Sequence, residues 1–215
     1  MSTMYETIQG LPLFKGTTSE QISLFLEKTN VEFHNFAPSD IIITAGQQCS
    51  HIRFILSGIV KSCIKVAGGT ATLCSLHGEN TVFCPTCLFG LYTEYNRDVI
   101  ALTEGSYMQI RKDQYFNLIQ SDSIYLLNYI NYISYRAQKS QLGLSCADKT
   151  NLEGWIKSIT TGLLDRNALV ATLLTTRQDL CNFLSLTAAD LENELIKLKE
   201  KGILSFAGNL ELSIK

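Results

Sequence analysis

The hydrophobic pattern of this 215-residue chain changes near residue 111, and that change most constrains its fold. Residues 31 to about 111 form short apolar runs such as "DIIITAG" and "VIAL", separated by glycine-rich turns such as "AGGT". Short strands punctuated in this way are typical of an antiparallel barrel or roll. The sequence therefore predicts an α+β fold whose first domain, residues 1–120, is a jelly roll, also described as a double-stranded β-helix.

A short amphipathic helix is expected ahead of the roll, after the turn "PLFKGTTSEQ". Thr17 or Thr18 is predicted to cap it, with Glu20 in its first turn. The apolar residues of this helix are Ile22, Leu24, Phe25 and Leu26.

A long helix is expected after the roll, over residues 121–146. The stretch "DSIYLLNYINYISYRAQKSQLGL" spaces its apolar residues so that they form one stripe along a helix. This stripe can pack on the roll of its own chain or on a second copy of itself. We favour the second copy, which makes the helix a dimerisation spine. The stripe residues are Leu126, Ile130, Ile133, Ala137 and Leu144.

The remaining residues, 147–215, are predicted to form a second domain. Helical patterns cover roughly 150–162, 176–184 and 187–201, and "GILSFAGNLELSIK" then provides two short strands about an "AGN" turn. Helix, helix, turn, helix and hairpin is the order of a winged helix.

The last two predicted helices have the pattern of a helix-turn-helix. Thr187 and Asp190 form an S/T-x-x-D/E cap, so acids in the first turn are stabilised by the helix dipole. The outward side of the second helix is then centred near Ala189, Asn193 and Ile196 and is nearly neutral. A helical pair that only packs is the alternative. The expected buried residues are Leu180, Phe183, Leu184, Leu191, Leu195 and Leu198.

Charge and cysteine usage narrow the classes of protein further. The apolar runs are far shorter than the roughly 18 residues of a membrane span, and "MSTMYETIQG" does not resemble a signal peptide. We therefore expect a cytoplasmic protein with no membrane partner.

The net charge of −2 means that any DNA affinity must come from local patches. Seven cysteines, an odd number, favour reduced thiols over a disulfide framework.

The order of roll, long helix and helix-turn-helix resembles the Crp/Fnr family of bacterial transcription regulators over nearly the whole chain. "LPLFKGTTSEQISLFL" is similar to the family's first helix, and "IIITAGQQCSHIRFILSGIVKS" to its roll, with the characteristic Gly46 and Gly58. "TTRQDLCNFLSLT" and "LKEKGIL" are similar to its helix-turn-helix. The resemblance implies a cyclic-nucleotide-binding-like roll that senses a small-molecule effector or redox signal. It also implies a homodimer on a palindromic double-stranded DNA operator, with RNA polymerase as a further partner.

The resemblance carries DNA contacts over to matching positions. Arg177 and Gln178 match the family's "TRQ", whose side chains typically touch phosphate. Ala188, Ala189 and Asn193 stand where base-reading residues, typically Arg, Glu and Arg, are usual. Because Arg to guanine is the commonest specific base contact, this protein is expected to read a different or looser sequence. Further candidates for base edges or phosphate are Thr187, Lys197, Lys199 and Lys201.

The stretch "ENTVFCPTCLFGLYTEYNRDVIAL" stands where nucleotide-binding members carry a "GE" pair and an "RS" or "RT" pair for ribose and phosphate. Here Cys84 and Pro85 replace the Gly and Glu, and Asp98 follows Arg97. A carboxylate beside the only candidate phosphate ligand argues against cAMP or cGMP as the effector.

The segment "CPTC", from Cys84 to Cys87, has the CxxC spacing of a dithiol redox switch or of half a metal site. Cys74 and His77 are the nearest residues that could complete a metal site, and a loop with half-buried thiols is the simpler interpretation. The iron-sulfur and haem patterns of the family are not matched, because no cysteine precedes Cys49 and the haem-ligand position holds threonine. No cofactor and no bound metal are therefore expected.

The effector is predicted to be an unidentified ligand between roll and spine, or to be absent altogether. His34, His51 and His77 lie in separate β-like segments without a catalytic arrangement, so no enzymatic activity is expected. The candidate pocket residues are Phe89, Tyr95, Arg97, Tyr129 and Tyr132.

Three hypotheses follow for the function. The leading one is a dimeric transcription regulator whose roll biases two winged helices. The second is a sensor or scaffold that has lost sequence-specific DNA binding and acts through protein contacts. The third is a thiol or metal sensor that works through Cys84 and Cys87.

Overall fold

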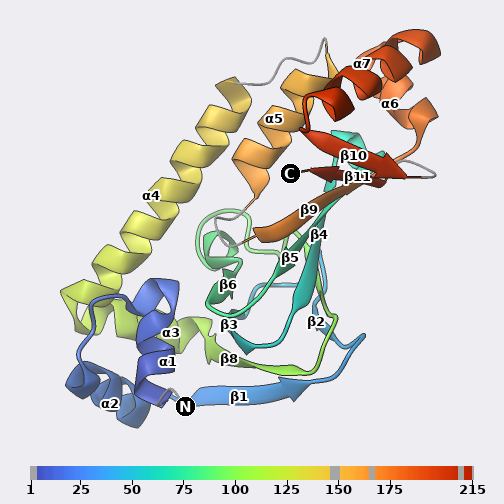
Figure 1. The fold of residues 1–215 in the computed structure, drawn as a ribbon. Helices are drawn as coiled ribbons and strands as arrows, with labels where there is room; N and C mark the ends of the chain where they lie inside the picture. Colours follow the sequence, from blue (N-terminus) through green and yellow to red (C-terminus); the bar gives the residue numbers. More distant parts are fainter. Residues whose placement is uncertain (1–3, 146–150, 165–167, 208–210, 215) are drawn as a thin grey trace. The chain divides into compact units, whose positions relative to one another are not determined.

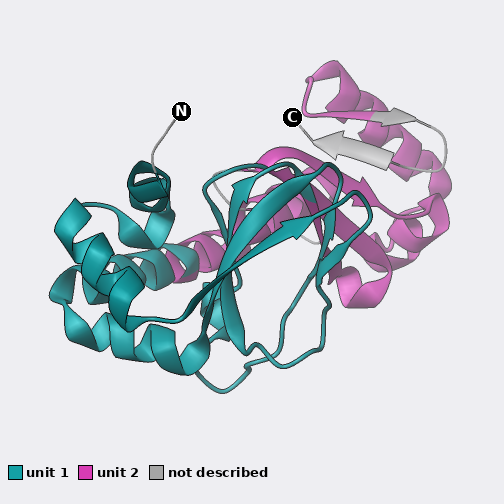
Figure 2. Cartoon of the chain, turned by 90° about the horizontal axis from the view of Figure 1, so that it is seen from below, with its two compact units in different colours: residues 1–60, 78–136 teal, residues 61–77, 137–215 magenta. Residues whose placement is uncertain are grey.

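The computed structural model of the chain describes residues 4–145, 151–164, 168–207 and 211–214 (Figure 1). The chain forms two compact units (Figure 2). Unit 1 comprises residues 1–60 and 78–136, and unit 2 comprises residues 61–77 and 137–215. The sequence pattern did not predict that residues 61–77 group with the C-terminal segment.

Unit 1 contains most of the roll, within the region predicted to be rich in strands. One antiparallel sheet has the order β1-β8-β3-β6, and β2 pairs antiparallel with β7 outside that sheet. The strands are β1 (Val31–Phe36), β2 (Ile41–Ile43), β3 (His51–Ser57), β6 (Thr81–Phe83), β7 (Asp98–Ala101) and β8 (Gly105–Arg111).

Tight packing at the end of β3 explains one of the two characteristic glycines. Gly58 has a φ of +86°, a conformation that side chains with a Cβ rarely adopt. A Cβ there would lie 2.6 Å from the carbonyl oxygen of Glu104. Only glycine lets the chain leave β3 this close to the segment that leads into β8.

Several helical segments belong to or begin in unit 1. As predicted, Thr18 caps α2: its hydroxyl accepts the Gln21 backbone N–H at 3.2 Å, and the Gln21 side chain accepts the Thr18 N–H at 2.9 Å. Such a reciprocal box stabilises a helix start by about 1 kcal/mol. The segments are α1 (Met4–Gly10), the 3-10 helix η1 (Pro12–Phe14), α2 (Ser19–Lys28), α3 (Lys112–Ser121) and α4 (Ser123–Ser145).

An aromatic cluster joins these helices to the sheet. The ring of Phe14 lies 5.1 Å from Phe25, 5.6 Å from Phe54 and 5.8 Å from Tyr125, measured between ring centroids. Phe14 and Phe54 have no exposed surface. Burial of each such side chain contributes on the order of 2 kcal/mol, so the helices form one core with the roll.

Unit 2 is built on an antiparallel sheet in the order β10-β11-β9-β5-β4. No strand was predicted from "ALVATLL", yet β9 spans these residues and pairs with β5 along its length. The apolar run lacks clear alternation, and its partner lies far earlier in the chain. The strands are β4 (Val60–Val66), β5 (Ala71–His77), β9 (Ala168–Leu174), β10 (Leu204–Ala207) and β11 (Glu211–Ile214), and a 3-10 helix, η2 (Ala67–Gly69), joins β4 to β5.

The three helices of unit 2 agree with the predicted ranges to within two residues at each end. They are α5 (Leu152–Leu163), α6 (Arg177–Leu184) and α7 (Ala188–Glu200). The Trp155 and Phe183 rings pack 5.3 Å apart, and the predicted stripe of Leu191, Leu195 and Leu198 is at most 2% exposed. Most of the predicted "AGN" turn lies outside the described residues.

A disulfide joins Cys63 of β4 to Cys74 of β5, so the expectation of reduced thiols throughout was wrong. The two Cα atoms are 4.2 Å apart, close to the spacing of directly opposed residues in a non-hydrogen-bonded antiparallel pair. The pairing of the two strands was needed to see that these residues face each other.

Helix α4 is the longest described helix, with 23 residues. None of the helices in the described ranges combines enough length with enough apolar character to cross a bilayer.

Candidate functional site

The CxxC segment of unit 1 forms a tight turn directly after β6. Cys84 has a φ of +55°, and a 3-10 helix, η3, spans Pro85–Cys87. The Cys87 backbone N–H donates to the Cys84 carbonyl at 3.0 Å. Side chains three residues apart in a 3-10 helix lie over one another, so the turn aligns the two thiols. The two thiols interact within this turn, and the interaction acts in opposite directions on their pKa values.

Asn96 distinguishes the two sulfur atoms. The Cys84 thiol donates to the Asn96 side-chain carbonyl oxygen, with Sγ 3.8 Å away, whereas the Asn96 backbone N–H donates to the Cys87 sulfur. The Thr86 hydroxyl lies 3.9 Å from the Cys87 sulfur. Cys87 is therefore surrounded by donors, which favour a thiolate, while Cys84 is held as a thiol.

The pKa values follow this asymmetry. The hydrogen bond from Cys84 lowers the pKa of Cys87 to about 6, with help from Thr86, Asn96 and the charge of Arg97 and against the effect of burial. The same hydrogen bond, together with burial, raises the pKa of Cys84 well above its ordinary value. The guanidinium of Arg97 is 7% exposed and donates through Nε to Asn96 at 3.3 Å.

The CxxC turn also touches the long helix. The Tyr129 hydroxyl of α4 donates to the Pro85 carbonyl at 3.1 Å. The Tyr129 ring packs against Phe89 and Tyr115, with centroids 5.8 Å apart in each case. Two of the predicted pocket residues, Phe89 and Tyr129, are thus in contact.

Tyr95 instead belongs to a polar row on the roll. Its hydroxyl accepts from Arg53 Nη1 at 2.7 Å and donates to the His51 carbonyl at 2.9 Å. Arg53 continues the row through Gln109, which in turn donates to Glu32 at 2.6 Å. These links cross three strands and could not be read from the sequence. Tyr132 packs as a half-buried side chain at the edge of the unit 1 core.

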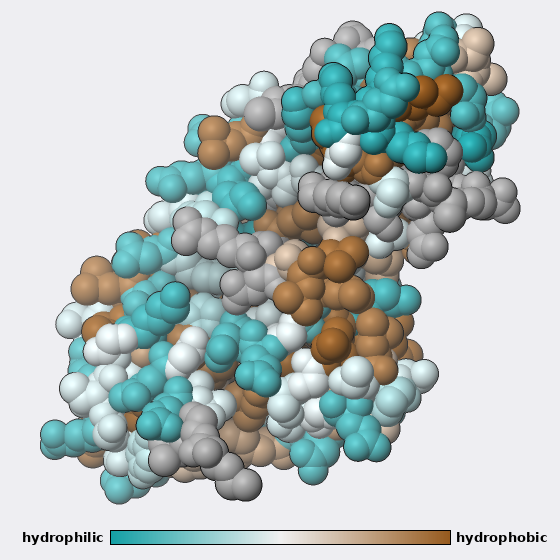
Figure 3. All heavy atoms as spheres, viewed as in Figure 1, coloured by the Kyte–Doolittle hydropathy of each residue, from teal (hydrophilic) through white to brown (hydrophobic). Residues whose placement is uncertain are grey.

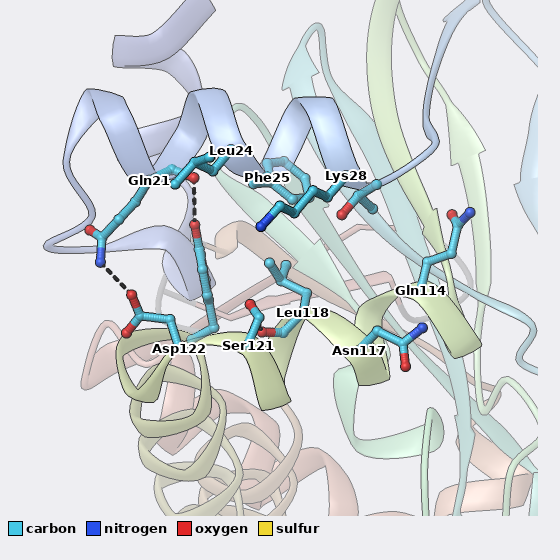
Figure 4. A pocket seen from close by; sticks show the side chains of 11 residues that line it. Gln21, Leu24, Phe25, Lys28, Gln114, Asn117, Leu118, Ser121 and Asp122 are labelled. Carbon is cyan, nitrogen blue, oxygen red and sulfur yellow. Dashed lines mark hydrogen bonds between the residues drawn. The ribbon is translucent and has the colours of Figure 1, made fainter.

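Two pockets in unit 1 are lined by residues outside this turn. One of about 260 Å³ lies between α2 and α3, where Gln21 Nε2 donates to Asp122 at 2.7 Å (Figure 4). The other, of about 700 Å³, reaches Cys49 and Phe89, with the Lys112 ammonium 5.5 Å from the Phe89 ring. Among the predicted effector residues, only Phe89 lines either pocket.

The two further metal ligands that the sequence suggested, Cys74 and His77, have other partners in the structure. Cys74 is bonded to Cys63, and His77 shares a 2.7 Å hydrogen bond with Ser75. Within the described residues, no group of three or more His, Cys, Asp or Glu side chains is arranged to hold a metal ion. The disulfide removes Cys74 as a ligand that could complete a site with the CxxC pair.

The second candidate site is the outward face of α7 in unit 2. Thr187 caps this helix by accepting the Asp190 N–H at 3.2 Å and donates its hydroxyl proton to the Asp190 carboxylate at 2.6 Å. Glu194 accepts the Leu152 backbone N–H at 2.6 Å and so caps α5. Both acids therefore have partners inside unit 2, and the cap predicted at Thr187 is confirmed.

Another acid of this helix meets the candidate phosphate ligand. Glu192 forms an ion pair with Arg177, the first residue of α6, and Gln178 donates to Asn182 at 3.0 Å. The outward face is open to solvent and nearly neutral, as predicted. Its exposed residues are Thr187, Ala188, Ala189, Asn193, Ile196 and Lys197.

The predicted stripe on α4 is largely exposed. Leu126 is 41% exposed, Ile130 49% and Leu144 72%, while Ile133 is half-buried and Ala137 is exposed. In Figure 3, brown apolar side chains reach the surface at several places along the course of α4. The end of this helix packs on α5 instead: a Cβ on Gly143 would lie 2.8 Å from the Gly162 Cα.

Part of the chain matches a known protein family. Residues 33–122 match the family model for the cyclic nucleotide-binding domain. The matched segment covers nearly all of the strands of unit 1 and also residues 61–77, which group with unit 2. The matched segment includes the CxxC turn and Arg97.

Nearly the whole chain is similar in structure to known regulators. Catabolite activator protein from Thermus thermophilus shares 17% identity, with a TM-score of 0.57, over 95% of this chain and 93% of that one. The c-di-GMP responsive global regulator CLP from Xanthomonas campestris shares 16%, with a TM-score of 0.51, over 92% and 100%. The sensor domain of the transcriptional regulator DNR from Pseudomonas aeruginosa shares 16%, with a TM-score of 0.51, over 61% and 91%. No curated protein sequence matches the chain.

Proposed function

We propose that the protein is a DNA-binding transcription regulator of the Crp/Fnr kind. The α6–α7 pair of unit 2 carries this proposal. A short turn joins the two helices, the acids of α7 are tied to Thr187, Arg177 and Leu152, and small side chains stand outward. A β-hairpin follows, in the order of a winged helix. The similarity in fold to solved structures of regulators supports this proposal.

Ala188, Ala189 and Asn193 would face the bases in this function. Without an arginine among them, discrimination rests on amide hydrogen bonds and methyl contacts, which suit A·T pairs better than guanine. Arg177 would exchange Glu192 for a phosphate on binding. Lys197 offers a second phosphate contact.

DNA binding to the chain's own upstream region tests this function. We expect a specific complex whose affinity falls with salt and drops about tenfold in Arg177→Ala, with a salt slope smaller by about one. Arg111→Ala is the matched control, because Arg111 is an exposed arginine paired with Asp113 in unit 1. Binding without sequence preference in both redox states would refute the proposal.

The active form is proposed to be a homodimer joined along α4. Exposed leucine and isoleucine side chains on one helix stripe lose contact with water when a second copy covers them. Ile130→Glu should convert a dimer to a monomer in sedimentation analysis. Leu91→Glu is the control, since Leu91 is 85% exposed and is not one of the stripe residues. A monomeric wild type would contradict the dimer.

One observation favours the scaffold alternative, in which sequence-specific DNA binding is lost. The Arg177–Glu192 pair neutralises the strongest phosphate ligand, and Ile196 is 50% exposed on the same face. Partners that remain bound after nuclease treatment, together with an absence of specific sites across the genome, would select this alternative.

A further inference from the structure

Cys84 adopts a backbone conformation that its neighbours disfavour. Its φ of +55° is rare for a residue with a Cβ, and proline follows it directly. Such conformations cost on the order of 1 to 3 kcal/mol and gather at functional sites. This conformation begins the turn in which the Cys87 N–H donates to the Cys84 carbonyl at 3.0 Å, so both cysteines belong to one tight turn.

The surroundings assign different tasks to the two sulfurs. The Asn96 backbone N–H donates to the Cys87 sulfur, the Thr86 hydroxyl lies 3.9 Å from it, and the charge of Arg97 acts on it. Cys84 donates to an amide oxygen and is the proton donor of the pair. Cys87 is therefore suited to act as the nucleophile, and Cys84 is suited to react with Cys87 in a second step.

We propose that Cys87 is a peroxide-reactive thiolate and that Cys84 resolves it into a Cys84–Cys87 disulfide. The oxidant is hydrogen peroxide or a comparably small hydroperoxide. The chemistry stands by itself, whereas its effect on DNA rests on the proposed function.

The reaction balances without a metal or cofactor. The Cys87 thiolate attacks one peroxide oxygen, an S–O bond forms, the O–O bond breaks, and the hydroxide that leaves takes the Cys84 proton. The Cys84 thiolate then attacks the Cys87 sulfur, an S–S bond forms, and hydroxide leaves from Cys87 and is protonated by solvent. Two sulfurs are oxidised, and one peroxide is reduced to two waters.

Burial selects a small oxidant. Cys84 is 8% exposed and Cys87 is 6% exposed, so a peptide disulfide has no line of approach. Peroxide is nearly as small as water. The pocket of about 700 Å³ reaches Phe89 and Cys49, and Phe89 lies two residues beyond the turn.

The turn is connected to α4 through one hydrogen bond. Tyr129 donates to the Pro85 carbonyl, which lies between the two cysteines, and its ring is held by Phe89 and Tyr115. A disulfide across residues 84–87 reorients the peptide units between them. The first change felt by α4 is therefore at Tyr129.

Peptide mapping of the reduced full-length chain after brief peroxide treatment tests the chemistry. We expect a Cys84–Cys87 disulfide in the wild type, and in Cys84→Ser a sulfenic acid at Cys87 that a dimedone-type reagent traps. Cys87→Ser should consume peroxide roughly tenfold more slowly. Cys181→Ser is the control, because Cys181 is a free thiol in unit 2. A sulfenic acid trapped first at Cys49, Cys84 or Cys181 in the wild type, with no Cys84–Cys87 disulfide, overturns the proposal, even if a variant does not fold.

Tyr129→Phe separates this chemistry from the proposed function. The disulfide should form at the wild-type rate, while the oxidation-dependent change in α4, followed by hydrogen exchange of its amides, should be lost. If DNA binding is absent but the disulfide forms as described, the proposed function fails and the thiol chemistry stands. If oxidation changes exchange equally in both proteins, the route through Tyr129 is wrong.

Discussion

Two arginines show how differently the units use positive charge. Arg97 in unit 1 is 7% exposed and lies among the cysteine turn and Asn96, whereas the side chain of Arg177 in unit 2 is 44% exposed and pairs with Glu192. A buried charge acts strongly on the groups around it, because little water screens it. An exposed ion pair is worth little and is weakened by salt. Arg97 therefore helps to lower the pKa of Cys87. Arg177 is available to exchange its partner Glu192 for a phosphate.

The largest expected effect concerns the core under the exposed face of α7. Leu195→Ala should lower the free energy of unfolding by about 2 to 5 kcal/mol, because Leu195 is fully buried. Ile196→Ala, one residue along and 50% exposed, should change it by less than about 1 kcal/mol. Trp155 is the only tryptophan and lies in unit 2, so its fluorescence follows this unit. Equal losses would mean that the two faces of α7 are misassigned.

The next prediction concerns pH and the buried thiol pair. The pKa of Cys87 lies at about 6, below its ordinary value of 9.0, so the thiolate stabilises the folded state fully above pH 9. That contribution is lost as the pH falls through about 6. Ultraviolet absorbance of the thiolate should titrate near pH 6 in the wild type and higher in Cys84→Ala, which has no proton to donate. A midpoint unchanged by that substitution would remove Cys84 as the cause.

Helix caps test whether the two units respond alike to the same local change. Thr187→Ala and Thr18→Ala each remove a side-chain acceptor at a helix start and should each cost about 1 kcal/mol in chemical denaturation. Serine at either position should restore most of the loss. A much larger cost at Thr187 would show that its contact with Asp190 stabilises more than the cap.

The smallest expected effect is an increase in DNA affinity. Glu192→Gln removes the ion pair with Arg177 and one negative charge beside the reading face. Affinity should rise severalfold at low salt, with a steeper salt dependence. Glu200→Gln, an exposed acid at the far end of α7, is the matched control. A decrease in affinity would indicate that the pair positions Arg177 for binding.

Much of the fold followed from local pattern. Alternation, glycine turns and caps indicated the roll, α2, α6 and α7, because these features depend on residues close together in the chain. Strand β9 was not predicted, because its pairing with β5, and not its own sequence pattern, makes it a strand. The exposed face of α7 was predicted, but the partners of Glu192 and Glu194 lie on other helices and were not.

The sequence by itself determined where the helices of unit 2 start and which of its leucines are buried. Only the tertiary structure decided that Cys63 meets Cys74, and that Asn96 and Arg97 come together around Cys84 and Cys87. The physical reason is the distance along the chain over which each interaction acts. Capping and periodicity act over three or four residues, whereas a thiol's reactivity depends on donors, charges and burial that only the closed roll assembles.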